Sequence, residues 1–214
     1  MAGKRTYGDS CGIARALDLV GERWALLVVR ELLLGPKRFT DLRAGLPSLS
    51  PDILTQRLRE LEEGGVVARR KLDPPAGSWV YELTERGREL EPVVIALGRW
   101  GSVVPMPPGD MRIGVDSTVL ALKTLFDPAA AAAGTYELRL DGQRFEARIA
   151  GGELELSRGA AAEPDAVIET DPVTLTRLIW GGGSLAAAQR SGAAAVEGDK
   201  RALERFLRLF PLPE

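Results

Sequence analysis

The segment from residue 37 to residue 83 constrains the fold more than any other part of the chain. Pro47 must end a short helix that begins near Arg38, because proline is not tolerated inside a helix. Ser50-Pro51-Asp52 then opens a second helix with a serine N-cap, a proline at the first helical position and an acid in the first turn. Gly64-Gly65 ends it, and two β-rich runs around a Pro/Gly turn predict a hairpin over 66–83. This order predicts a helix-turn-helix followed by a β-hairpin wing.

The second helix has an apolar stripe and a polar face. Leu54, Leu58 and Leu61 recur at helical spacing, so they are expected to face a core. The polar side chains roughly opposite the stripe lie near the helix N-terminus: Asp52, Thr55, Gln56 and Arg59. Hydrogen-bonding side chains at this place can contact base edges in the major groove of DNA, although a solvated helix face is the plainer alternative.

Basic residues gather in the same segment. Residues 37–71 hold eight cations and five acids in a chain whose net charge is −2. Arg57 lies near the apolar edge of the helix, where pairing with Glu60 is the alternative to touching DNA. Strand alternation prevents Arg69, Arg70 and Lys71 from all facing one way, so only some are expected at phosphates. The predicted DNA-contacting residues are Arg38, Thr40, Ser48, Ser50, Asp52, Thr55, Gln56, Arg57, Arg59, Arg69, Arg70 and Lys71.

Several motifs in order resemble the HxlR family of bacterial transcriptional regulators, which are relatives of the MarR group. The similar segments are Cys11 to Trp24, Arg38 to Leu42, Ser50 to Glu62, Tyr81 to Thr84 and Leu97 to Trp100. The resemblance covers about residues 8–104 and implies a homodimeric DNA-binding repressor or activator. The chain departs from the family pattern because it continues for about another hundred residues.

Apolar side chains on a helix predicted over residues 11–20 and on a helix after the wing predict a dimer interface. Thr84 is expected to cap a long helix from residue 85 to about residue 103, which Pro92 kinks or divides. A helix after the wing has little of its own domain left to cover, although packing on that domain is the alternative. The predicted interface residues are Ile13, Leu17, Leu90, Val94, Leu97 and Trp100.

The chain divides by composition. We predict a winged-helix DNA-binding and dimerisation domain at 1–104, a Pro-rich linker at 105–111 and an α+β domain with an antiparallel sheet at 112–214. The element order of the second half is similar to sterol-carrier-protein-like domains, which implies an apolar tunnel for an effector. The pocket candidates are Leu122, Phe126, Trp180, Leu185, Phe206 and Phe210, for each of which a plain core position is the alternative.

Composition narrows the chemistry. The chain has no histidine and one cysteine, so we expect no metal site, no cofactor and no enzyme activity. Cys11 occupies a place where some members of the HxlR family sense oxidants or electrophiles, and an apolar contact at the dimer interface is the alternative. No apolar run approaches the roughly 20 residues of a membrane span, and no signal peptide is evident, so we expect a cytoplasmic protein.

Together these features predict a dimeric regulator that binds a double-stranded DNA operator, is modulated by a small apolar ligand and does not bind membranes. The alternative is a small-ligand or lipid carrier whose winged helix serves assembly. Basic charge concentrated on helix and wing favours the regulator. The operator, the regulated genes, the direction of regulation and the identity of an effector do not follow from the sequence.

Overall fold

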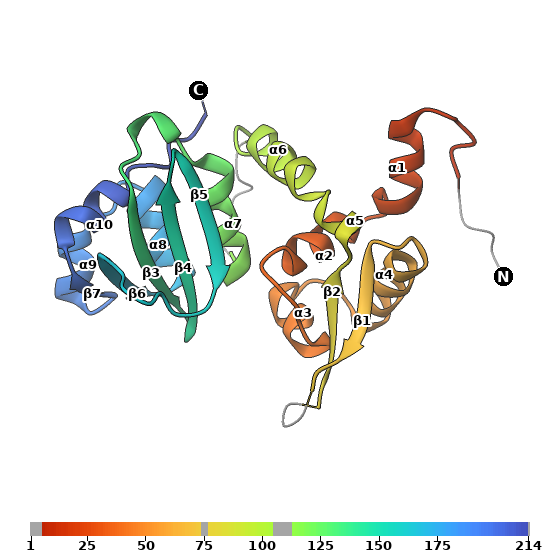
Figure 1. The fold of residues 1–214 in the computed structure, drawn as a ribbon, viewed down its shortest axis with the longest axis horizontal. Coiled ribbons are helices and arrows are strands. Elements are labelled where there is room, and N and C mark those ends of the chain that lie inside the picture. Colours follow the sequence, from red (N-terminus) through yellow and green to blue (C-terminus); the bar gives the residue numbers. More distant parts are fainter. Residues whose placement is uncertain (1–5, 74–76, 105–112, 214) are drawn as a thin grey trace. The chain divides into compact units, whose positions relative to one another are not determined.

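The computed structural model describes residues 6–73, 77–104 and 113–213. The chain forms two compact units, Met1–Val94 and Ile95–Glu214 (Figure 1). The predicted linker 105–111 lies outside the described residues. In the second unit the Arg99 Nε donates to the Thr124 carbonyl at 3.2 Å, which ties residues after Val94 to the C-terminal part of the chain. The domain boundary at residue 104 stays a prediction.

The first unit contains the predicted helix-turn-helix and hairpin. Its elements in chain order are α1 (Gly12–Val20), α2 (Ala25–Leu32), α3 (Phe39–Gly45), α4 (Pro51–Glu63), β1 (Val67–Lys71), β2 (Trp79–Leu83) and α5 (Glu85–Arg88); α6 (Glu91–Gly101) begins in this unit and ends in the second. The strands β1 and β2 are antiparallel, as predicted for a hairpin. The helix predicted over 85–103 is divided in two just before Pro92.

Local signals in the sequence explain where α4 begins and ends. The Ser50 Oγ accepts a hydrogen bond from the Ile53 backbone N–H at 3.4 Å, and Pro51 occupies the first helical position. Gly65, just after the helix, has a φ of +69°, a left-handed conformation that glycine adopts without strain. The predicted caps of this helix are therefore confirmed.

The core of the first unit forms where α4 packs on α2. Leu54, Leu58 and Leu61 are almost completely buried, as their spacing predicted, and they share one core with Val28 and Val29 of α2. Burying each of these leucine side chains stabilises the fold by roughly 1.5–3 kcal/mol. This packing leaves the opposite, polar face of α4 toward solvent.

A buried carboxylate links α2, α3 and the wing. Glu31 is 1% exposed, and its carboxylate accepts hydrogen bonds from the Lys37 Nζ at 2.6 Å and the Arg30 Nη2 at 2.8 Å. A Cβ added at Gly45 would lie 2.1 Å from the Glu31 Oε2, so glycine makes room for the carboxylate. The Lys37 backbone also pairs with Tyr81 of β2 through two hydrogen bonds. The start of α3 is therefore held to both the core and the hairpin.

The second unit is a five-stranded sheet with helices. Its elements are α7 (Val115–Leu125), the 3-10 turn η1 (Pro128–Ala130), β3 (Gly134–Leu140), β4 (Gln143–Ala150), β5 (Glu153–Arg158), β6 (Ala166–Thr170), α8 (Pro172–Trp180), α9 (Leu185–Ser191), β7 (Ala194–Gly198) and α10 (Lys200–Phe206). The strand order is β5-β4-β3-β6-β7. The sterol-carrier-like identity of this unit stays a prediction.

The sheet of the second unit is mixed. The predicted antiparallel meander β3-β4-β5 is confirmed, and β6-β7 is also antiparallel. One pair departs from the predicted antiparallel sheet, because β3 and β6 pair in parallel with Tyr136 opposite Ala166. After β5, at one edge of the sheet, the chain crosses over to the far side of β3. There it forms β6, which runs in the same direction as β3.

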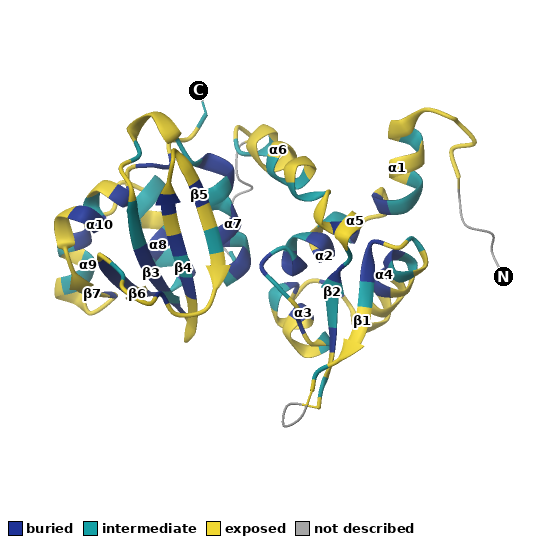
Figure 2. Ribbon diagram, viewed as in Figure 1, coloured by how far each residue is buried: buried dark blue, intermediate teal, exposed yellow. Residues whose placement is uncertain are grey.

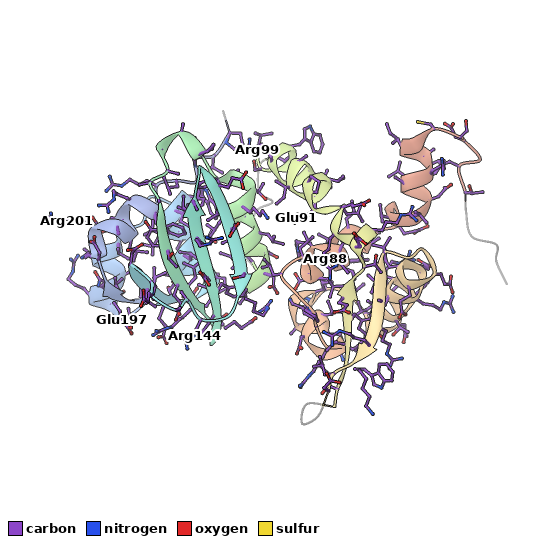
Figure 3. All side chains as sticks on the ribbon, viewed as in Figure 1. Arg88, Glu91, Arg99, Arg144, Glu197 and Arg201 are labelled. Atoms are coloured by element: carbon purple, nitrogen blue, oxygen red, sulfur yellow. The ribbon has the colours of Figure 1, made fainter. Side chains whose placement is uncertain are left out.

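A second buried carboxylate lies in the middle of this sheet. Glu137 of β3 is 1% exposed and accepts hydrogen bonds from the Arg139 Nε at 2.7 Å and the Ala161 N–H at 2.9 Å. Arg144, labelled in Figure 3, adds three more from β4. Burial raises the pKa of Glu137, but these hydrogen bonds outweigh it, so the net pKa lies below the ordinary value of 4.5.

This lowered pKa predicts a loss of stability in acid. A carboxyl whose pKa is lowered by folding stabilises the native state above its unfolded pKa, and that contribution is lost as the pH falls through the folded pKa. We expect the urea midpoint of the second unit to decrease as the pH is lowered past ~4 in the native chain. The decrease should be less steep in E137Q, which lacks the carboxyl group. The control is E155Q, which removes an exposed partner of Arg148. Parallel pH profiles for E137Q and the native chain would contradict the prediction.

Candidate nucleic-acid interface

Eleven of the twelve predicted DNA-contacting residues are exposed (Figure 2). They come from α3, the turn after it, the N-terminal part of α4 and the hairpin. These exposed residues are Arg38, Thr40, Ser48, Ser50, Asp52, Thr55, Gln56, Arg59, Arg69, Arg70 and Lys71. A polar and cationic surface of this kind offers donors and acceptors to base edges and cations to phosphates.

Two exposed side chains of α4 pair within the helix. The Gln56 Nε2 donates to the Glu60 Oε1 at 2.9 Å, and the Arg59 Nε lies 3.5 Å from the Glu63 Oε1. Contacts between exposed side chains one turn apart are weak, typically about 0.5 kcal/mol or less. Gln56 and Arg59 can therefore exchange these partners for an outside ligand at little cost.

Arg57 does not belong to this surface. Its side chain is buried, and its Nη1 pairs with the Glu60 carboxylate and lies 3.7 Å from the Glu22 carboxylate in the connection between α1 and α2. Its Nε is also buried, without a hydrogen-bond partner among the described residues. The inclusion of Arg57 among the DNA-contacting residues is corrected, because the pairing with Glu60 that we weighed against it removes the guanidinium from the surface.

The hairpin arranges its three consecutive cations on different sides. The Arg69 guanidinium lies over the Trp79 ring, 4.5 Å from its centroid, and 5.9 Å from the centroid of Tyr81. The Arg70 Nε instead donates to the Glu82 Oε1 at 2.8 Å. The expectation that strand alternation separates these cations is confirmed.

Sequence analysis missed Trp79 as part of this surface. Its ring is 51% exposed and supports the Arg69 guanidinium. The signal available in the sequence was a tryptophan just after the Pro/Gly turn, opposite the three cations of the predicted hairpin. That Arg69 is the cation over the Trp79 ring required the structure, because the strand register places Arg69 opposite Tyr81 and Lys71 opposite Trp79.

Four of the six predicted dimer-interface residues are exposed, and the other two pack partly against the core of the first unit. Leu90 and Val94 are half-buried, whereas Ile13, Leu17, Leu97 and Trp100 are exposed, Trp100 to 71%. Helix α6 has no buried residue although much of its sequence is apolar. A cleft of about 610 Å³ lies between α1 and α5, with Leu90 in its wall.

Cys11 is exposed at the N-cap of α1. Its backbone N–H donates to the Asp9 Oδ1 at 2.9 Å, which fixes the entry to the helix. The thiol is therefore accessible, and its role as a redox sensor stays a prediction.

The predicted pocket residues of the second unit pack mostly against one another. Phe210 lies 5.1 Å from Phe206 and 6.2 Å from Phe126 between ring centroids, and its carbonyl accepts from the Trp180 Nε1 at 2.8 Å. Leu122 and Leu185 are buried. Phe126 lines a cleft of about 250 Å³ and Phe206 another of about 300 Å³, and the other four line neither. Neither of these two clefts gathers the six residues, and their role as a ligand pocket stays a prediction.

Within residues 6–73, 77–104 and 113–213, no cluster of three or more potential metal ligands is found. No helix in the same part of the chain is long and apolar enough to cross a membrane.

Comparison with known proteins places the first unit in a family. Residues 19–107 match the HxlR-like helix-turn-helix family. The HTH-type transcriptional regulator sll1512 of Synechocystis sp. is 41% identical over 44% of this chain and 70% of its own length. The HTH-type transcriptional regulator YvaP of Bacillus subtilis is 38% identical over 41% of this chain and 82% of its own length. The chain belongs to the HxlR-like helix-turn-helix family.

Solved structures similar to part of this chain include two regulators. The oxidized form of the redox regulator HypR is 36% identical and covers 45% of this chain and 100% of its own, with a TM-score of 0.41. The reduced form of the transcriptional regulator YodB from B. subtilis is 34% identical and covers 48% of this chain and 100% of its own, with a TM-score of 0.40.

Proposed function

We propose that this protein is a homodimeric, sequence-specific DNA-binding transcriptional regulator whose second unit senses a small molecule. The observation that carries the proposal is the exposure of the polar face of α4 and of Arg69 and Lys71 on the hairpin, while the leucine stripe of α4 is buried. This is the arrangement in which a recognition helix enters the major groove and a wing contacts the backbone. Relatives named as HTH-type transcriptional regulators support it.

The buried Glu31–Lys37 pair supports the proposal because it orders the reading surface. Lys37 joins the core carboxylate to β2, and α3 begins two residues later. Within α3 the Asp41 Oδ2 accepts from the Arg38 N–H at 3.2 Å. A surface held by such contacts needs little rearrangement on binding, which favours specificity.

Homodimerisation is proposed from the uncovered apolar side chains of α1 and α6. Ile13, Leu17, Leu97 and Trp100 stay exposed in the single chain, and a second copy would remove them from water. A symmetric dimer presents two copies of α4 to half-sites spaced by about one turn of DNA, roughly 34 Å. The expected operator is therefore an inverted repeat.

Titration of the purified chain against its own upstream DNA, with scrambled DNA as competitor, tests the function. We expect tighter binding to the upstream DNA by a factor of at least about 10³ at physiological salt. Equal and weak affinity for both DNAs would overturn the proposal and favour the alternative, a small-ligand carrier in which the winged helix serves assembly.

The wing should contribute charge rather than sequence reading. Replacing Arg69 and Lys71 together by alanine is expected to weaken binding to upstream and scrambled DNA alike. If each cation neutralises one phosphate, the slope of log affinity against log salt flattens by about 2 per wing. Fluorescence anisotropy over several salt concentrations measures the slope.

The comparison variant for the wing is Arg70→Ala. Arg70 already pairs with Glu82, so its loss should change the slope less than the loss of Arg69 and Lys71. An unchanged slope in the double variant would show that these two side chains do not reach phosphates.

A further inference from the structure

A polar cleft in the second unit has not been assigned a role. It has a volume of about 300 Å³ and lies between the start of β3, the segment that precedes β3, and α10. Arg201, labelled in Figure 3, marks the first turn of α10. The side chains that carry its chemistry are Tyr136, Asp165, Asp199, Arg205 and Arg208, with Leu209 as part of an apolar wall. The volume is at the small end of the range typical of ligand pockets, roughly 300–1,000 Å³.

Tyr136 of β3 lines this cleft. The residue is 4% exposed, and its ring stacks on Phe206 at 4.3 Å between centroids. Its hydroxyl makes no hydrogen bond to any residue that the structure describes. The oxygen is not one of the fully buried side-chain atoms that lack a partner, so it is open to the cleft. A ligand in the cleft can therefore form a hydrogen bond with it.

The hydroxyl of Tyr136 and the carboxylate of Asp165 converge beside Gly134. A Cβ added at Gly134 would lie 2.9 Å from the tyrosine hydroxyl and 3.1 Å from the Asp165 Oδ2. Burial raises the pKa of Tyr136, and the negative charge of Asp165 raises it further, so the hydroxyl stays protonated and can donate. Glycine at this position keeps the space between the two groups open.

The charged groups of the cleft have unused hydrogen-bonding capacity. Arg205 and Arg208 are exposed and form no ion pair or hydrogen bond through their guanidinium groups with the described residues. The Asp165 Oδ2 accepts from the Thr135 N–H at 2.8 Å, and the Asp199 Oδ1 accepts from two N–H groups at the start of α10. The second oxygen of each carboxylate accepts no hydrogen bond from the described part of the chain.

We propose that this cleft binds a small carboxylic acid that also carries a hydroxyl or ammonium group. The ligand carboxylate pairs with Arg205 and Arg208, which offer the planar donors that suit it. The hydroxyl or ammonium group donates to Asp165, and the Tyr136 hydroxyl donates to a ligand oxygen. Two arginines and two aspartates give the cleft no net charge, so a molecule with both an acid and a donor fits better than a simple anion or an apolar effector.

As the effector site of the regulator, this cleft rests on the proposed function, but its ligand binding can be measured without DNA. The probes are mandelate and phenylglycine, compared with phenylacetate, which lacks the donor, and phenylethanol, which lacks the acid. They are titrated into the full ¹⁵N-labelled chain and followed by two-dimensional NMR. We expect saturable shifts at residues 134–136, 165 and 205 with mandelate or phenylglycine, and weaker binding of the other two probes.

Variants identify the groups that hold the ligand. Tyr136→Phe keeps the stacking on Phe206 and removes only the hydroxyl, so affinity should fall between about threefold and about tenfold. Gly134→Ala places a methyl group between the hydroxyl and Asp165, and Arg205→Ala removes a cation, so both should weaken binding at least as much. The matched controls are Tyr7→Phe and Arg190→Ala, an exposed tyrosine and an exposed arginine that do not line the cleft.

The outcomes separate this inference from the proposed function. No saturable shift from mandelate or phenylglycine at millimolar concentration, or equal binding by the native chain, Tyr136→Phe and Arg205→Ala, would overturn the inference. Specific DNA binding by the same protein would then leave the regulator standing. Saturable ligand binding in a chain that does not distinguish upstream from scrambled DNA would support the site and overturn the proposed function instead.

Discussion

Replacing Lys37 by methionine is expected to lower the free energy of unfolding of the first unit by about 3 kcal/mol. The substitution keeps the apolar stem and removes the ammonium group that lies 2.6 Å from the buried Glu31 Oε2. Removing one partner of a buried pair leaves an uncompensated charge, which typically costs about 3–5 kcal/mol. We take the lower end because the Arg30 Nη2 still donates to Glu31 at 2.8 Å. Urea unfolding read by NMR signals of the first unit measures the loss.

Two further variants make this result specific to the buried pair. Lys71→Met makes the same chemical change at an exposed lysine and should alter stability by no more than about 0.5 kcal/mol. Adding Glu31→Gln to Lys37→Met removes the orphaned charge, so the double variant should be more stable than Lys37→Met alone. A loss below about 1 kcal/mol for Lys37→Met would show that Arg30 compensates the carboxylate by itself.

Replacing Gln56 and Arg59 together by alanine is expected to lower specific operator affinity about 100-fold. Each good side-chain contact to a base edge contributes roughly 1–3 kcal/mol of discrimination, and two at the lower end amount to this factor. Both side chains now pair only within α4, with Glu60 and Glu63, so losing these contacts should cost little stability. Alanine also favours the helix. Anisotropy titrations of operator and scrambled DNA measure the ratio of affinities.

Glu62→Ala on the same helix is the matched control for folding and helix content. The Gln56/Arg59 double variant should lose much less affinity for scrambled DNA than for operator DNA, because it removes only one positive charge. An equal decrease for both DNAs would mean that α4 contributes charge alone. Unchanged operator affinity would show that α4 is not the element that reads the sequence.

The first unit could be predicted in most of its elements because its signals are local. Ser50, Pro51 and Gly65 act on the backbone within a few residues, so the ends of α4 follow from side-chain chemistry at those positions. The spacing of the leucines in α4 predicts its buried face for the same reason, because residues three or four apart lie on the same side of a helix. The meander β3-β4-β5 likewise follows from alternation and turn glycines.

Positions that depend on partners far away in the chain could not be predicted. The pairing of Arg57 with Glu60 could be weighed from the sequence, because the two residues lie one turn apart. Glu22, however, comes near Arg57 only once α4 has docked beside the α1–α2 connection. The phenylalanines of the second unit would show the same apolar pattern in the sequence whether they line a cavity or fill a core. Only the structure shows that they contact one another, at 5.1 and 6.2 Å between ring centroids.

The sequence by itself therefore determined the caps of α4, the spacing of its buried leucines, the β1-β2 hairpin and the family. Only the tertiary structure decided that Glu31 and Lys37 meet in the core, that β6 lies parallel to β3, and that Tyr136 reaches a polar cleft with Asp165 and Arg205. The physical reason is that local propensity acts over a few residues, whereas burial and electrostatic pairing depend on every element packed around a site.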